Sequence, residues 1–182
     1  MSLRKIFLHP DPVLRKVCLP VERFDTELAA LVRDMAETMY AAPGVGLAAP
    51  QVGVTQRVFV VDARENGKDG PSTLRVFVNP EITEKQGEVV WEEGCLSLPN
   101  VNADITRAER VVVKAFNEKG EPFTLEADGL LADAIQHEND HLDGIVLFDR
   151  LSPLKRRFAM KRYLKDLAKD EETSSSASPA SR

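Results

Sequence analysis

The feature that most constrains this chain is the run QHENDH at residues 136–141, which holds two of its three histidines. Residues four apart on an α-helix lie one turn above each other on the same face. A helix here would let His137 and His141 bind one metal ion, with Glu138 beside them as a base. The spacing therefore predicts a metal-dependent hydrolase built on a largely buried helix.

The bulk properties favour a single domain. The chain has 182 residues, of which 43% are hydrophobic, and a formal charge of -5, which argues against a general nucleic-acid binder. No apolar run approaches the ~20 residues of a membrane helix, and the N-terminus lacks the apolar segment of a secretory signal. We expect a cytoplasmic protein with one catalytic domain over residues 1–170 and a disordered tail over residues 171–182.

Helical periodicity and turn signals outline the secondary structure. Asp25 or Thr26 can cap a first helix, and Asp128 and Gly144 suit the two ends of the helix that carries the histidines. We expect helices over residues 26–40, 128–144 and 153–169, with a helical turn at 12–16. β-Branched and aromatic runs predict strands at residues 57–62, 75–80, 89–91 and 111–116, followed by a hairpin turn at 117–120 and a strand at 122–125.

Two histidines alone do not make a catalytic metal site, which usually has three protein ligands and a water molecule. The candidate third ligand is Cys95, in the run EGCLS upstream of the helix. A neighbouring metal ion would keep its thiolate ionised at neutral pH. Taken alone, Cys95 is equally well explained as a small buried residue, and Cys18, among apolar neighbours, is expected to be a buried inert thiol.

A third segment, GVGLAAPQ at residues 44–51, also suggests a site. Its two glycines permit close approach of the backbone to a ligand, and Gln51 can donate a hydrogen bond to a developing oxyanion. Alone, the segment would mark only a tight loop. Together and in this order, GVGLAAPQ, EGCLS and QHENDH resemble the peptide deformylases, whose motifs are GxGxAAxQ, EGCLS and QHExDH.

The resemblance implies a fold and an activity. The fold is α+β, with mixed, mostly antiparallel sheets packed around a central buried HExxH helix, and a C-terminal helix. The activity is removal of the formyl group from the N-terminal formyl-methionine of newly synthesised proteins, with release of formate. The cofactor is one divalent metal ion, with Fe(II) expected first and Zn, Ni or Co as substitutes, since thiolate and imidazole ligands suit each of them.

The same resemblance assigns residues to roles. They are the metal ligands Cys95, His137 and His141, the acid–base Glu138, and the oxyanion donors Gln51 and the backbone N–H of Leu96. The substrate is expected to lie extended beside Val45 and Gly46, like an added strand. Val45, Trp91 and Leu130 are candidates for the apolar walls of a methionine pocket, although Trp91 is equally well explained as a core residue.

Three charged residues have competing interpretations. Asp133 stands where the family often has an apolar pocket residue; we expect its carboxylate to point to solvent, with a pocket position or a pair with Arg107 as alternatives. Metal-bound histidines usually donate their second N–H to a carboxylate or carbonyl, and Asp140 could serve His137 in this way or be surface charge. Arg107 could brace the Cys95 loop, but we expect it to be solvated.

The basic C-terminal helix is either a solvated face or a surface for weak, salt-sensitive docking on the ribosome. Two other functions share the HExxH helix. A peptidase that cuts internal peptide bonds would not need Cys95 as a ligand. A non-catalytic module with a structural metal would need a fourth protein ligand, and the spare His9 and Cys18 belong to no metal motif.

Overall fold

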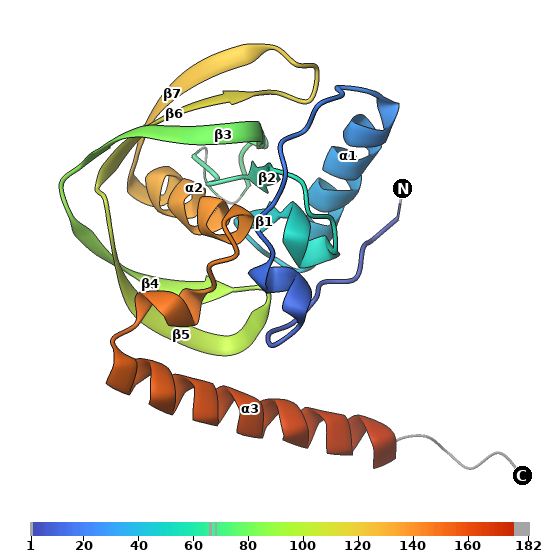
Figure 1. Ribbon diagram of the computed structural model, residues 1–182, viewed down its shortest axis with the longest axis vertical. Coiled ribbons are helices and arrows are strands. Elements are labelled where there is room, and N and C mark those ends of the chain that lie inside the picture. Colours follow the sequence, from blue (N-terminus) through green and yellow to red (C-terminus); the bar gives the residue numbers. More distant parts are fainter. Residues whose placement is uncertain (1, 66, 68, 177–182) are drawn as a thin grey trace, which may run out of the picture.

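A central helix lies between two antiparallel sheets in the computed structural model, which describes all residues except 1, 66, 68 and 177–182 (Figure 1). The strands are β1 (Gly46–Ala48), β2 (Val58–Val61), β3 (Arg75–Gln86), β4 (Val89–Cys95), β5 (Leu98–Arg107), β6 (Arg110–Phe116) and β7 (Pro122–Asp128). The helices are α1 (Thr26–Ala41), α2 (Gly129–Leu142) and α3 (Pro153–Ser176), with single 3-10 turns η1 (Pro12–Arg15), η2 (Ala49–Val52) and η3 (Leu147–Arg150).

The larger sheet has the strand order β1-β2-β3-β6-β7, and the smaller sheet pairs β4 with β5. Every pair of named strands is antiparallel. In Figure 1, β3, β6 and β7 lie on one side of α2, and β4 and β5 lie on the other. The α+β class expected from the sequence is confirmed.

The position of α2 follows from its apolar strip. Leu131, Ile135 and Leu142 are all buried, and they pack with Phe59 and Phe77 of the larger sheet in one hydrophobic cluster. Burial of each such side chain contributes roughly 1.5–3 kcal/mol. Because this strip faces the five-stranded sheet, the histidines on the adjoining face of the helix are turned toward β4.

The two ends of α2 carry the expected residues. Asp128 occupies the N-cap position, although its side chain makes no capping hydrogen bond. Gly144 has φ 72°, and a Cβ on it would lie 2.5 Å from the carbonyl oxygen of Arg15. A side chain at this position would therefore be strained and would also push the N-terminal arm away from the helix.

Helix α1 also forms as expected. The carboxylate of Asp25 accepts hydrogen bonds from the backbone N–H groups of Glu27 and Leu28, both at 3.1 Å, which caps the helix. Met35 and Met39, one turn apart, are fully buried in a second cluster against the strands β1 and β2. This packing holds the segment that follows α1, which contains the glycine motif.

The strands differ from the sequence-based expectation in three places. Residues 46–48, expected as part of a loop, form the edge strand β1, and β3 and β4 continue beyond the predicted runs to Gln86 and Cys95. Strand β5 was not predicted at all. Its sequence LPNVNADITR has a low β-propensity, and its extended form comes from pairing with β4 along nearly its whole length.

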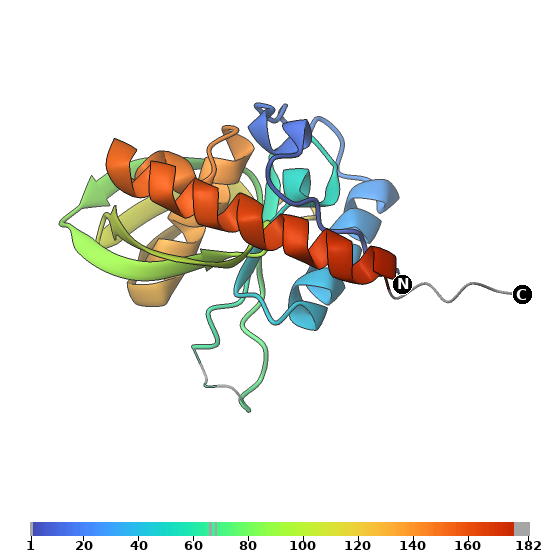
Figure 2. The same cartoon turned by 90° about the horizontal axis from the view of Figure 1, so that it is seen from below.

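Helix α3 lies across the outer side of β5, as Figure 2 shows from below. Its Tyr163 is buried against Leu98, Ile105 and Phe148. The helix continues to Ser176, so residues 171–176, expected to be disordered, are helical; residues 177–182 lie outside the described part of the chain. Among the described residues, no helix is both long and apolar enough to cross a bilayer.

Candidate active site

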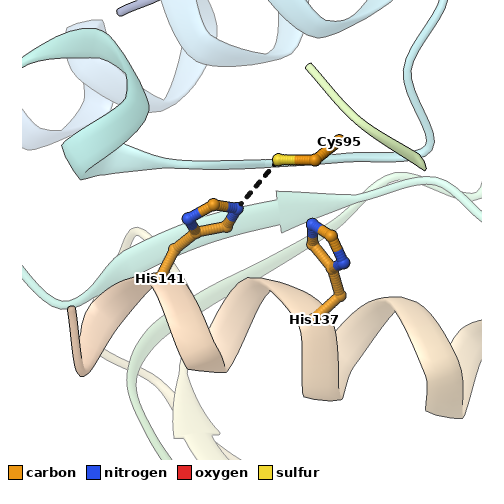
Figure 3. A group of neighbouring side chains, drawn as sticks. All are labelled: Cys95, His137 and His141. Carbon is orange, nitrogen blue, oxygen red and sulfur yellow. Dashed lines mark hydrogen bonds between the residues drawn. The ribbon is translucent and has the colours of Figure 1, made fainter. Parts of the chain in front are cut away.

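Cys95, at the end of β4, faces His137 and His141, which project from adjacent turns of α2 (Figure 3). One ligand atom from each residue lies within 4.8 Å of the other two, and Cys95 Sγ is 3.4 Å from His141 Nε2. A tetrahedral ion with typical metal–sulfur and metal–nitrogen bonds would hold its sulfur and nitrogen ligands about 3.6 Å apart. The structure thus brings together the three residues predicted as metal ligands, at separations that one cation can bridge.

The ionisation of the two histidines is compatible with such a cation. Burial lowers the pKa of His141 well below its usual value, so its imidazole is neutral and can offer a lone pair. Burial also acts to lower the pKa of His137, but hydrogen bonds with Cys95 and Glu93 raise it well above the usual value. A cation would therefore displace a proton from this cluster as it binds.

His137 is held by Glu93, which the sequence analysis missed. Its Nδ1 N–H donates to Glu93 Oε2 at 2.8 Å, while Arg107 donates to both oxygens of Glu93, from Nε at 2.7 Å and from Nη2 at 3.0 Å. Burial acts to raise the pKa of Glu93, but these hydrogen bonds outweigh it and hold the pKa far below the usual value. Because strand residues two apart share a face, the EGC spacing could have identified Glu93 as a neighbour of Cys95.

Arg107 is buried, which corrects the expectation that it is solvated. Its third hydrogen bond, from Nη1, goes to Asp140 Oδ2 at 2.7 Å, and Asp140 also accepts hydrogen bonds from Arg150. Asp140 is therefore neither the partner of His137 nor free surface charge. Asp140 holds Arg107 in place, and Arg107 holds Glu93. These three charged side chains together orient the imidazole of His137 through its Nδ1.

The expectation that Asp133 points to solvent is wrong, because only 7% of its surface is exposed. Burial, together with a hydrogen bond and the negative charge of Glu93, raises the pKa of Asp133 to about 7. A proton shared between the carboxyl groups of Asp133 and Glu93 would accommodate this contact. Asp133 Oδ1 is buried, and no N–H or hydroxyl group of the described residues donates to it.

The glycine motif packs directly on the other two motifs. A Cβ on Gly44 would lie 2.8 Å from Cδ1 of Leu96, the residue that follows Cys95. A Cβ on Gly46 would overlap the carboxylate of Glu138 and lie 2.8 Å from its Cγ. Both separations are shorter than any ordinary van der Waals contact, so only glycine allows the three segments to approach this closely.

Gln51 completes the contact between the motifs. Its Oε1 accepts the backbone N–H of Ala48 at 2.9 Å, which fixes the orientation of the amide. Its Nε2 then donates to the hydroxyl of Ser97 at 3.1 Å and lies 3.7 Å from Cys95 Sγ. The amide donor is thus held beside the metal-ligand cluster, although Gln51 itself is buried and is not among the residues that line the cavity beside it.

Glu138 lies beside the same cluster. It is buried, its Oε2 has no hydrogen-bond partner in the described part of the chain, and burial raises its pKa to about 7. Leu96 lies in the turn at residues 96–97 between β4 and β5 and lines the same cavity as Glu138. The residues assigned as acid–base and as backbone oxyanion donor therefore line one cavity.

A cavity of about 380 Å³ opens beside this cluster. It is walled by residues 43–46, by the β4–β5 turn region at residues 92–96 and 98–102, and by one face of α2. The helix contributes Leu130, Asp133, Ala134, His137 and Glu138 to the lining. Of the predicted pocket residues, Val45, Gly46 and Leu130 line the cavity, whereas Trp91 is not among its lining residues and instead pairs with Ile105 on β5.

The two other residues that could have been metal ligands, Cys18 and His9, lie away from the cluster. Cys18 is buried in the main hydrophobic cluster, where burial raises the pKa of its thiol to about 11, as expected for an inert thiol. His9 is buried between Phe148 and Tyr163. Among the described residues, the only group of three or more potential metal ligands is the Cys95, His137 and His141 cluster, which does not suit a closed four-ligand structural site.

Comparisons with known proteins agree with this geometry. The polypeptide deformylase family profile matches residues 3–157. A peptide deformylase of Neisseria gonorrhoeae is 56% identical over 156 residues, which cover 86% of this chain and 91% of that protein. The crystal structure of a peptide deformylase from Legionella pneumophila matches with a TM-score of 0.85 and 46% identity, over 98% of this chain and 100% of that one.

A third relative is similar in fold at lower identity. The crystal structure of a peptide deformylase from Ehrlichia chaffeensis, in complex with actinonin, has a TM-score of 0.85 and 38% identity over 91% of this chain and 98% of its own. Sequence and structure therefore lead to the same group of metal-dependent hydrolases. This chain belongs to the polypeptide deformylase family.

Proposed function

We propose that this protein hydrolyses the formyl group from the N-terminal formyl-methionine of newly synthesised proteins and releases formate. Membership of the family makes it a metal-dependent hydrolase that removes N-formyl groups from nascent peptides. The observation that carries the finer proposal is the convergence of Cys95, His137 and His141 beside a cavity that also holds Glu138.

The donor set fits a divalent ion, since a thiolate and two imidazoles leave a position open for water or substrate. When bound, such an ion supplies Lewis acidity, which polarises the formyl oxygen and lowers the pKa of water toward about 7. Cys95, His137 and His141 would hold it. We propose Fe(II) as the native ion, with Zn, Ni or Co as substitutes; anaerobic purification followed by metal analysis tests this assignment.

Proton transfer falls to Glu138. Its carboxylate takes a proton from the water molecule as the water oxygen attacks the formyl carbon. It then passes that proton to the amide nitrogen as the carbon–nitrogen bond breaks, which yields formate and a free amino group. Its close contact with Gly46 supports the role, because that contact holds the carboxylate at the cavity wall.

The negative charge that develops on the formyl oxygen would be met by Gln51 Nε2 and the backbone N–H of Leu96. The hydrogen bonds of Gln51 to Ala48 and Ser97 hold its amide in place before the substrate arrives. Loss of one such donor typically lowers the rate about 10²–10³-fold.

The substrate would lie along β1, beside Val45 and Gly46. In the strand order of the larger sheet β1 is an edge strand, so its outer side suits an extended peptide that pairs through the backbone. The first side chain of the peptide would then enter the cavity beside His137 and Glu138, where Val45, Leu130 and Ala134 supply apolar contacts.

The decisive experiment compares formate release from formyl-Met-Ala-Ser with hydrolysis of acetyl-Met-Ala-Ser. We expect formate from the first peptide and no acetate from the second, because a site shaped to hold a formyl group would exclude the additional methyl group sterically. Glu138→Gln is the matched variant: it should bind one metal ion per chain but release no formate. Cleavage of internal peptide bonds by the wild-type protein, or an active Glu138→Gln variant, would contradict the proposal.

We further propose that the protein works in the cytoplasm, where nascent chains appear, and that α3 docks weakly on the ribosome. Seven basic side chains support the docking: Lys155, Arg156, Arg157, Lys161, Arg162, Lys165 and Lys169. Removal of α3 would also remove Tyr163 from the hydrophobic core and so destabilise the fold. Variants that change only exposed charges on α3 therefore test docking without this side effect.

Replacement of Lys161, Arg162 and Lys165 by Gln should weaken co-sedimentation with ribosomes at low salt, because it removes contacts to RNA phosphates. It should also reduce the salt dependence of binding. The matched control replaces three exposed lysines elsewhere by Gln: Lys85, Lys114 and Lys119. Equal co-sedimentation of the two triple variants would exclude α3 as the docking surface.

A further inference from the structure

The N-terminal arm joins the two segments that carry the proposed oxyanion donors. The backbone N–H of Phe7 donates to the carbonyl oxygen of Gln51 at 2.8 Å. Two residues further along, the backbone N–H of His9 donates to the carbonyl oxygen of Ser97 at 2.9 Å. Ser97 follows Leu96 in the β4–β5 turn. This short stretch of the arm therefore links η2 to that turn through backbone hydrogen bonds alone.

The same two segments are also joined by side chains. Gln51 Nε2 donates to the Ser97 hydroxyl at 3.1 Å, and both residues are only 1% exposed. The arm, Gln51 and the β4–β5 turn thus form a closed ring of hydrogen bonds. Because a buried network of satisfied bonds is rigid, the ring holds the side-chain amide of Gln51 in a constant position relative to the backbone N–H of Leu96.

Side chains anchor the arm on either side of this ring. A Cβ on Gly53 would lie 2.8 Å from Cε2 of the Phe7 ring, and Gly53 has φ 83°, so only glycine lets this ring pack at the end of η2. At the other end, the hydroxyl of Tyr163 donates to the carbonyl oxygen of His9 at 2.7 Å. The arm is therefore held by both η2 and α3.

We propose that Phe7 and His9 are positioning residues, whose backbone N–H groups align the two oxyanion donors with each other. Neither residue is among those that line the cavity, so both act through the segments they hold. The inference rests on the proposed function, because it assumes that Gln51 and Leu96 meet the charge on the formyl oxygen. That charge develops only in the transition state, so a displaced donor lowers kcat and leaves KM nearly unchanged.

The experiment replaces one backbone N–H group by an ester oxygen. Cys18 permits residues 1–17 to be made as a synthetic thioester and joined to residues 18–182 by ligation at a natural cysteine. Phenyllactic acid in place of Phe7 then removes the N–H donor and keeps the aromatic ring on Gly53. The all-amide chain, made by the same ligation, refolded and loaded with the same divalent ion, is the reference.

The matched control carries the corresponding ester at Val13, where hydroxyisovaleric acid replaces valine. The N–H of Val13 donates to Asp11 Oδ1 at 2.9 Å. The control therefore loses a hydrogen bond from the same arm, but one that lies within the cap of η1 and joins neither donor segment. Both ester chains are also made with Gln51→Ala, and circular dichroism establishes that each chain is folded.

We expect the Phe7 ester to lower kcat for formate release from formyl-Met-Ala-Ser about tenfold at unchanged KM, and the Val13 ester to keep the reference kcat. With Gln51→Ala, the Phe7 ester should have no further effect on kcat, since no side-chain amide remains to be aligned. A readout independent of turnover comes from NMR of chains in which residues 18–182 carry ¹⁵N. The side-chain amide protons of Gln51 should exchange with water faster in the Phe7 ester than in the Val13 ester.

An unchanged kcat in the folded Phe7 ester would overturn the inference, as would an equal loss in the Val13 ester or an effect that adds fully to that of Gln51→Ala. If the Phe7 ester does not refold, Tyr163→Phe tests the same arm, because it releases the carbonyl group of His9. That variant should lower kcat at unchanged KM, and an unchanged kcat would also overturn the inference. Failure of the proposed function has a different signature, since the reference chain itself would then release no formate.

Discussion

The substitution Arg107→Met tests whether the buried charges behind His137 hold the fold together. Arg107 makes three hydrogen bonds, two to Glu93 and one to Asp140, and its side chain is only 4% exposed. Methionine keeps the length and apolar stem of the side chain but removes the charge and all donors. Glu93, 3% exposed, would keep only its neighbours His137 and Asp133 as hydrogen-bond donors.

Removal of one partner from a buried ion pair typically costs about 3–5 kcal/mol, because the remaining charge is left uncompensated. In a domain of this size each kcal/mol lowers Tm by about 2–4 °C, so we expect Arg107→Met to lower Tm by roughly 6–20 °C. In the double variant, Glu93→Gln should recover part of this lost stability, since it removes the carboxylate charge that Arg107→Met leaves uncompensated. The two substitutions should then be coupled by about 2–3 kcal/mol.

The assay is urea unfolding followed by circular dichroism, in excess chelator so that metal affinity does not enter the measured stability. Arg162→Met is the matched control, because it breaks an ion pair with Asp166 whose arginine side chain is 84% exposed. An exposed pair of this kind contributes at most about 0.5 kcal/mol. A second measurement, competition for zinc with a chelating dye, should show about 10–100-fold weaker metal binding in Arg107→Met, because His137 loses its fixed orientation.

The reasoning is refuted if Arg107→Met is no less stable than Arg162→Met, or if its effect simply adds to that of Glu93→Gln. Additivity would mean that Arg107 and Glu93 stabilise the fold independently and do not act as one buried unit.

Three further outcomes are expected. Gly46→Ala should lower kcat/KM about 100-fold while Tm changes by only a few degrees, because the new Cβ displaces the Glu138 carboxylate. Tyr163→Phe should lower the free energy of unfolding by about 0.5–1.5 kcal/mol in urea titrations, through loss of the 2.7 Å hydrogen bond to the His9 carbonyl. Burial acts to raise the pKa of Asp62, but hydrogen bonds lower it to about 2. Its stabilising effect is therefore complete above the usual carboxyl pKa of about 4 and is lost as the pH falls through about 2, so Asp62→Asn should flatten the fall of Tm between about pH 5 and 2.

The parts of the fold that could be predicted are those in which local sequence and burial agree. The cap at Asp25, the buried strip on α2 and the glycine after it each follow from a short segment alone, and each is found where expected. Strand β5 could not be predicted in this way. Its polar sequence is extended because β4 offers a partner, and that partner lies across a turn whose geometry no local pattern records.

The same distinction applies to the site. The positions of His137 and His141 follow from helix geometry, because a spacing of four places both on one face. The burial of Asp133 and Arg107 could not be predicted from their own neighbours, since a charged residue on a helix or strand is normally solvated. Both are buried against Glu93, which lies on another strand. Its carboxylate compensates the charge of Arg107, whereas burial and its negative charge raise the pKa of Asp133 and so favour the neutral acid.

The contacts between the motifs explain why the three segments carry information together that none carries alone. Gly44 packs against Leu96 and Gly46 packs against Glu138, at distances that exclude any larger residue in place of the glycines. Gln51 is hydrogen bonded to Ser97, a contact that requires a polar side chain at each position. A glycine in a loop or an HExxH helix satisfies only its own local constraint. The two glycines of the first segment are spaced to receive a side chain from each of the other two segments. The three motifs therefore specify how distant parts of the chain pack together, and this packing places the metal-ligand cluster beside the cavity.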